Sequence, residues 1–124
     1  MPLPPHIRAG KAAERYARRW LEQQGLQHLL ANYCCKAGEL DLVMRDHTVL
    51  VVVEVRYRAH TRFGGALASI SPQKQQRIAR ATQHLLRTNT DWSRLALRFD
   101  VVALTGAPPH TRVDWRKRAF YAEA

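Results

Sequence analysis

Two acidic residues within apolar segments are the side chains of this sequence best suited to chemistry. Asp41 lies in GELDLVMR (38–45) and Glu54 in VLVVVEVRY (49–57). Unpaired charges are expensive to bury, so each carboxylate needs a partner. Both segments have the composition of β-strands, and a tight turn at 46–47 joins them into a hairpin. Counting outward from that turn predicts Asp41 and Glu54 nearly opposite each other, at the end of the hairpin away from the turn.

This pair of carboxylates has two interpretations. Two carboxylates about 4 Å apart repel by about 4 kcal/mol at an effective dielectric constant near 20, so a proton, a cationic side chain or a metal must offset the repulsion. Mg²⁺ suits the pair, because it takes one or two carboxylates and completes its shell with water and phosphate oxygens. That arrangement predicts metal-dependent phosphodiester hydrolysis. Alternatively Arg56, on the same face of the strand as Glu54, neutralises both carboxylates in an ion network without chemistry.

The overall charge indicates the class of partner. The chain has 124 residues, the length of one domain, and 20 Lys and Arg stand against 10 Asp and Glu, which gives a net charge of +10. Such an excess is typical of proteins that bind polyanions, most often nucleic acid. The sequence has neither a long apolar run nor a secretory signal, and its two cysteines, Cys34 and Cys35, are adjacent. We therefore expect a cytoplasmic protein without disulfides or membrane contact.

The elements that position the two carboxylates follow from hydrophobic periodicity. The expected order is α-β-β-β-α-β, a single α/β domain in which helices pack against a mixed sheet. The expected helices span 10–25 and 73–87, the second entered through Ser71-Pro72. A short apolar stretch at 26–33 is expected to end in a strand. Three further strands are expected at 39–45, 49–57 and 95–104. Leu40, Leu42 and Met44 are expected on one face of their strand. Residues 1–9 are expected to form a tail, 10–105 the domain, and 106–124 a basic and aromatic extension.

Four motifs in order carry a resemblance to a known family. They are GELDLV (38–43), VVVEVRYR (51–58), SPQKQQRI (71–78) and RFDVV (98–102). Together they resemble the YraN-like family of the PD-(D/E)XK nuclease superfamily, whose restriction-endonuclease-like fold has an αβββαβ core and includes Holliday junction resolvases. The resemblance implies a Mg²⁺- or Mn²⁺-dependent endonuclease that acts on DNA rather than RNA, with branched or damaged DNA as the expected substrate. By analogy with resolvases it also implies a homodimer.

The same resemblance assigns roles to particular residues. Asp41 and Glu54 resemble the metal-binding carboxylates, and the Val55 carbonyl is a further expected ligand. Glu14 resembles a helix glutamate that reaches the metal directly or through water. Polar residues at the start of the second helix, Gln73 and Lys74, resemble those bordering the site in relatives. Glu39 is interpreted either as a neighbour of the site or as a solvated strand end.

Arg56 departs from the family pattern, which usually has lysine at this position. Arginine keeps the positive charge but cannot act as a base, and its planar guanidinium has a different geometry. Three outcomes are open. Arg56 clamps the scissile phosphate, Lys74 takes over the lysine role from the neighbouring helix, or catalysis is lost and a DNA- or RNA-binding module remains.

Five basic residues and one glutamine are expected to contact nucleic acid or to form a solvated surface. They are Arg58, Arg62, Lys74, Arg77 and Arg80, together with Gln73. A third function class, weaker than nuclease or nucleic-acid-binding module, is a protein-interaction module for an acidic partner. Asp100, in RFDVV, is interpreted as structural and paired with a neighbouring arginine.

Overall fold

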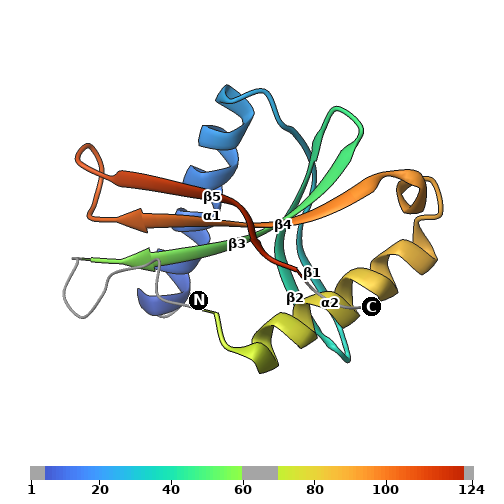
Figure 1. Ribbon diagram of the computed structural model, residues 1–124. Helices are drawn as coiled ribbons and strands as arrows, with labels where there is room; N and C mark the ends of the chain where they lie inside the picture. Colours follow the sequence, from blue (N-terminus) through green and yellow to red (C-terminus); the bar gives the residue numbers. More distant parts are fainter. Residues whose placement is uncertain (1–4, 60–69, 122–124) are drawn as a thin grey trace.

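The computed structural model describes residues 5–59 and 70–121 (Figure 1). Its elements follow the expected α-β-β-β-α-β order and add a final strand. They are α1 (Pro5–Gln23), β1 (Gln27–Cys35), β2 (Gly38–Asp46), β3 (Val49–Arg58), α2 (Pro72–Thr88), the 3₁₀ helix η2 (Trp92–Arg94), β4 (Ala96–Thr105) and β5 (Arg112–Phe120). The prediction of a single α/β domain with a mixed sheet is confirmed.

One sheet holds all the strands in this part of the chain, in the order β1-β2-β3-β4-β5. Strands β3 and β4 are parallel, and the other neighbours are antiparallel. Each face of the sheet is covered by one helix: Ala17 and Leu21 of α1 share a buried cluster with Val53, whereas Ile78 and Leu85 of α2 share another with neighbouring strand residues. Burial on both faces explains why β3 is apolar along almost its whole length.

The segment expected to be a C-terminal extension forms β5 instead. This strand pairs antiparallel with β4, from Thr105↔Arg112 to Phe99↔Phe120. Its Val113 and Trp115 side chains pack against the cluster under α1. At the other end of the chain, α1 begins at Pro5, so the helix starts five residues earlier than the expected Gly10.

The expected common face of Leu40, Leu42 and Met44 is wrong for Leu40. Leu42 and Met44 lie in the cluster under α1, but Leu40 lies in the cluster under α2. The facing strand β1 has a left-handed backbone at Asn32, where φ is 54°. Pairing between β2 and β3 also ends at Leu42↔Val53. The regular alternation of side chains is therefore interrupted where β2 parts from β3.

The entry to α2 follows the sequence prediction. The Ser71 hydroxyl accepts a hydrogen bond from the Lys74 amide at 3.1 Å, and Pro72 occupies the first turn. Serine caps one of the otherwise unpaired amides of the helix start, and proline has no amide to satisfy there. The cap therefore fixes the helix turn that carries Lys74.

Replacement of Ser71 by alanine is expected to lower the free energy of unfolding by about 1 kcal/mol, because the Lys74 amide loses its cap. Urea denaturation measures the difference. Ser71→Asp serves as the control, since aspartate caps as well as serine. Equal losses in the two variants would contradict the assignment of the cap.

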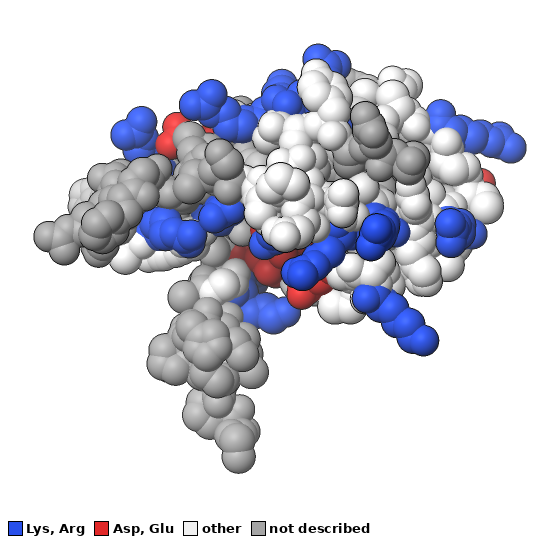
Figure 2. Space-filling model, turned by 60° about the horizontal axis from the view of Figure 1, so that its bottom comes forward, with Lys and Arg blue, Asp and Glu red and all other residues white. Residues whose placement is uncertain are grey.

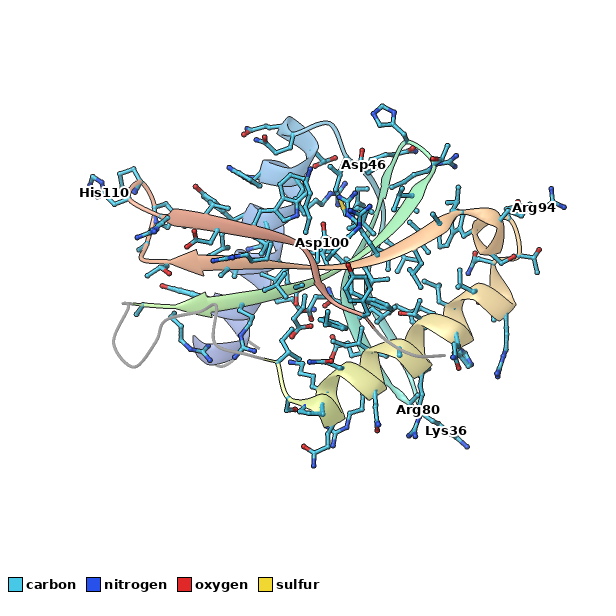
Figure 3. All side chains as sticks on the ribbon, viewed as in Figure 1. Lys36, Asp46, Arg80, Arg94, Asp100 and His110 are labelled. Atoms are coloured by element: carbon cyan, nitrogen blue, oxygen red, sulfur yellow. The ribbon has the colours of Figure 1, made fainter. Side chains whose placement is uncertain are left out.

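A buried carboxylate ties β5 to β4. Asp100 is fully buried near the middle of the sheet (Figure 3). The Arg98 Nε lies 3.1 Å from each carboxylate oxygen, and the Trp115 indole donates to Oδ2 at 2.9 Å. The Arg118 amide donates to Oδ1 at 3.0 Å, and Arg98 also pairs with Asp46 at 3.0 Å. The expected pairing of Asp100 with a neighbouring arginine is confirmed.

Candidate active site

Asp41 and Glu54 meet where β2 separates from β3. The last paired residues are Leu42 and Val53, so Asp41 and Glu54 occupy the next position of the two strands. The Asp41 Oδ2 accepts a hydrogen bond from the Val55 amide at 2.9 Å, in place of a main-chain acceptor on β2. The two carboxyl groups also share a hydrogen bond. The structure therefore brings together the pair that the hairpin count predicts.

The environment of Asp41 favours its protonated form. Burial raises the pKa of Asp41 to about 8, and repulsion from the Glu54 carboxylate acts in the same direction. The hydrogen bond from the Val55 amide stabilises the charged form and opposes the shift. Near neutral pH Asp41 therefore keeps its proton.

Lys74 supplies the cation that the pair requires. Its Nζ lies 2.6 Å from the Glu54 Oε1. The Glu54 side chain is only 7% exposed, whereas that of Lys74 is half exposed and open to solvent. Lys74 precedes the buried Ile78 by four residues, so it occupies the first turn of the helix face that packs on the sheet. A cation on α2 thus stands beside the carboxylates of β2 and β3.

Arg56 does not neutralise the carboxylate pair. Alternation along β3 places it on the same face as Glu54, and its side chain is partly buried. Within residues 5–59 and 70–121, Glu54 is paired with Lys74, and Arg56 forms no ion pair. The internal network expected from Arg56 is therefore absent from this part of the chain, and Lys74 takes that electrostatic place.

Glu14 approaches the same region from α1. Burial raises its pKa, and a hydrogen bond from the Asn32 side chain lowers it. The charges of Glu39 and Glu54 also raise the pKa, so these three carboxylates are electrostatically coupled. Sequence reasoning missed Asn32, which lies opposite Asp41 on β1. Its left-handed backbone has no signal in the sequence beyond the tolerance of asparagine for that conformation.

The donors at the strand fork fit a magnesium ion. Within an antiparallel pair, the amide and carbonyl of one residue face the same neighbouring strand. Because the Val55 amide faces Asp41, its carbonyl faces the fork as well. Two carboxylates and one carbonyl match the partial oxygen shell that Mg²⁺ takes from a protein. Among the described residues, no three Asp, Glu, His or Cys side chains are grouped closely enough to hold a metal.

The residues expected to contact nucleic acid are distributed unevenly. Arg77 lies against Gly38, at the start of β2. Arg80 points away from the sheet (Figure 3), and Gln73 is exposed. The Arg58 guanidinium donates to the carbonyl of Tyr57 at 2.7 Å, and Arg62 lies outside the described residues. Figure 2 shows acidic side chains gathered near the middle of one face, with Lys and Arg side chains around them.

These features define a class: a single-domain α/β protein with a carboxylate pair at a fork in a mixed sheet and a helix lysine beside it. Residues 13–104 match the family described as Uncharacterised protein family UPF0102. The chain belongs to this family.

Relatives cover nearly its whole length. A UPF0102 protein of Pseudomonas putida (strain GB-1) is 50% identical over 97% of this chain and 98% of its own length. A relative in Alkalilimnicola ehrlichii is 48% identical over 95% of this chain and 90% of its own. One in Klebsiella pneumoniae is 50% identical over 90% and 84%. Separately, none of the described helices is long and apolar enough to cross a membrane.

Proposed function

We propose that this protein is a Mg²⁺-dependent endonuclease of the PD-(D/E)XK superfamily that hydrolyses DNA phosphodiester bonds. The observation that carries the proposal is the Asp41–Glu54 pair at the strand fork, with Lys74 2.6 Å from Glu54. Two carboxyl groups held together in the sheet are costly without a compensating role, and carboxyl groups with a strongly raised pKa are typical of active sites. The net charge of +10 supports a polyanionic substrate.

In phosphodiester hydrolysis, each residue of the site has its own role. Asp41, Glu54 and the Val55 carbonyl would hold the ion, with Glu14 near them on α1. When bound, the ion would supply Lewis acidity toward a phosphate oxygen and would lower the pKa of bound water. Lys74 stabilises the negative charge that develops on the phosphate and keeps Glu54 in position. Arg56, on the same face as Glu54, donates to a phosphate oxygen, a role that its fixed charge permits.

The test is cleavage of labelled DNA by the purified protein, with linear duplex and four-way branched substrates presented in parallel. We expect cutting in Mg²⁺ or Mn²⁺, faster on branched DNA, and complete loss of cutting in EDTA. A cytoplasmic location agrees with Cys34 and Cys35, both free thiols. That the protein is a homodimer stays a prediction by analogy with resolvases. Analytical ultracentrifugation of the same preparation measures the oligomeric state.

A second candidate function is a nucleic-acid-binding module that retains the fold without cleavage. Arg56 favours it, because arginine stands where related nucleases usually carry lysine and forms no ion pair in the described part of the chain. This function predicts salt-sensitive binding to DNA or RNA that EDTA leaves unchanged, with no cutting of any substrate. The cleavage assay therefore separates the two functions.

Lys74→Met is expected to slow cleavage by about 10²-fold, because one positioned charge-stabilising group is lost. Lys74→Arg keeps the charge and is expected to recover part of the rate. Arg56→Lys serves as the matched change on β3 and is expected to keep or raise activity. Single-turnover rates measure these three variants and Arg56→Met. Full activity of Lys74→Met, with inactivity of Arg56→Met, would assign the cationic role to Arg56 instead.

A further inference from the structure

A basic and aromatic groove runs along α1, on the flank turned away from Glu14. It has a volume of about 400 Å³ and is lined by Ala12, Arg15, Tyr16, Arg19, Trp20 and Gln23. Residues four apart on a helix lie on the same side. Arg15 and Arg19 therefore form one row along the groove, and Tyr16 and Trp20 form a second row beside it.

The surface of the groove continues beyond Tyr16 at one end and beyond Trp20 at the other. A second cavity, of about 140 Å³, shares Ala12 and Tyr16 with it and reaches Tyr57 on β3 and Thr111 beside β5. Beyond Trp20, the Trp115 ring of β5 makes an edge contact at 5.7 Å between centroids. The Lys117 Nζ lies 4.5 Å from the centre of that Trp115 ring. Aromatic rings thus line both cavities and the Trp115 end of the path, and positive charge lies beside them at Arg15 and Arg19 and at Lys117.

The charges of this path select for an anionic ligand. None of the six residues lining the groove is acidic. Arg15 and Arg19 are exposed, and in the described ranges neither forms an ion pair, unlike Arg18 on the other flank, which pairs with Glu22. An acidic peptide satisfies the arginines but leaves the aromatic rings uncovered. A polynucleotide satisfies both, with phosphates on the arginines and bases on the rings.

We propose that this groove, defined as the six residues listed above, binds an unpaired strand of nucleic acid. Unpaired bases are required, because only they expose faces for stacking on Tyr16 and Trp20. The inference rests on the proposed function, since it names an unpaired strand as part of that enzyme's substrate. The groove lies on the opposite flank of α1 from Glu14, so it is a separate contact from the carboxylate pair.

The test measures binding without cleavage. Anisotropy of a fluorescein-labelled oligothymidylate of about 12 nucleotides, a length that matches common single-strand site sizes, is titrated in EDTA with the full chain. Arg15→Gln/Arg19→Gln is compared with Arg87→Gln/Arg94→Gln, which removes the same charge from exposed positions elsewhere. Tryptophan quenching by the oligonucleotide is recorded in parallel, in the parent and in Trp20→Phe. Far-ultraviolet circular dichroism confirms that each variant is folded.

We expect the groove variant to bind about tenfold more weakly and its log–log salt slope to fall by about 1.4, or 0.7 for each lost phosphate contact. The control variant should change by less than about twofold, and Trp20→Phe should reduce the quenching. Equal weakening in both variants would overturn the proposal in favour of general charge. Displacement by polyglutamate at equal charge concentration, or concentration-dependent self-association lost only in the groove variant, would overturn it in favour of an acidic peptide or a second copy.

Because binding is measured in EDTA, the result is independent of catalysis. Loss of cleavage with intact groove binding would reject the nuclease function alone. If the protein cleaves DNA but the groove variant binds the oligonucleotide as well as the parent does, this inference alone would be rejected.

Discussion

Asp41→Asn is expected to stabilise the protein at neutral and alkaline pH while it slows cleavage by at least about 10²-fold. Burial and the Glu54 charge raise the pKa of Asp41 from its ordinary 3.8 to about 8. Between these values the folded protein holds a proton that the unfolded chain has released. The contribution of Asp41 to stability is therefore complete below about pH 4 and is lost as pH rises through about 8.

Asparagine is neutral at every pH and still accepts the hydrogen bond from the Val55 amide. The free energy of unfolding of the Asp41→Asn variant should exceed that of the parent by about 1–3 kcal/mol near pH 8, with no gain near pH 4. Urea denaturation across this range measures the difference. Asp91→Asn, at an exposed position, is the matched control and should show no pH-dependent gain. A difference that stays constant with pH would contradict the assigned environment of Asp41.

Asp100→Ala is expected to destabilise the protein by about 3–5 kcal/mol. The Arg98 side chain is only 10% exposed and pairs with the fully buried Asp100. Removing that carboxylate leaves Arg98 with Asp46 as its one partner in the described ranges, and removes the acceptor of the Trp115 indole and of the Arg118 amide. Burying an uncompensated charge costs far more than losing a surface ion pair. This loss approaches the whole stability of a small domain.

Thermal and urea unfolding measure the Asp100 effect. Asp114→Ala, on β5, is the control, because among the described residues Asp114 pairs with the exposed Arg112 alone. The double variant Arg98→Met/Asp100→Leu should recover most of the loss, since it removes both buried charges together. If Asp100→Ala loses no more stability than Asp114→Ala, the network around Asp100 does not hold β5 to β4.

The carboxylate pair could be predicted because strand periodicity and a short turn leave little freedom. Once the turn lies beside residue 47, Asp41 and Glu54 must fall at facing positions. Ser71-Pro72 was equally informative, because cap and proline mark a helix start within a residue. The side of the sheet reached by Lys74 depends on how α2 crosses the sheet. Lys74 as the replacement for the usual lysine therefore remained one of three alternatives at the level of sequence, and its contact with Glu54 was not predicted.

Other features had no local signal. RVDWRKRAF (112–120) carries mostly polar residues along an edge strand, and only the pairing with β4 and the burial of Trp115 make it a strand. Leu40 lies in the cluster under α2, apart from Leu42 and Met44, at the point where β2 is no longer paired with β3. Both depend on contacts between distant segments, which override local preference.

Single-turnover cleavage of branched DNA by the parent and by Asp41→Asn, prepared identically, tests the central claim most directly. The parent should cut in Mg²⁺ and stop in EDTA. Asp41→Asn should cut at least about 10²-fold more slowly, although it is folded and more stable. Equal cutting by the two proteins would contradict the assignment of the carboxylate pair as the active site. No cutting by the parent in Mg²⁺ or Mn²⁺ would contradict the nuclease function itself.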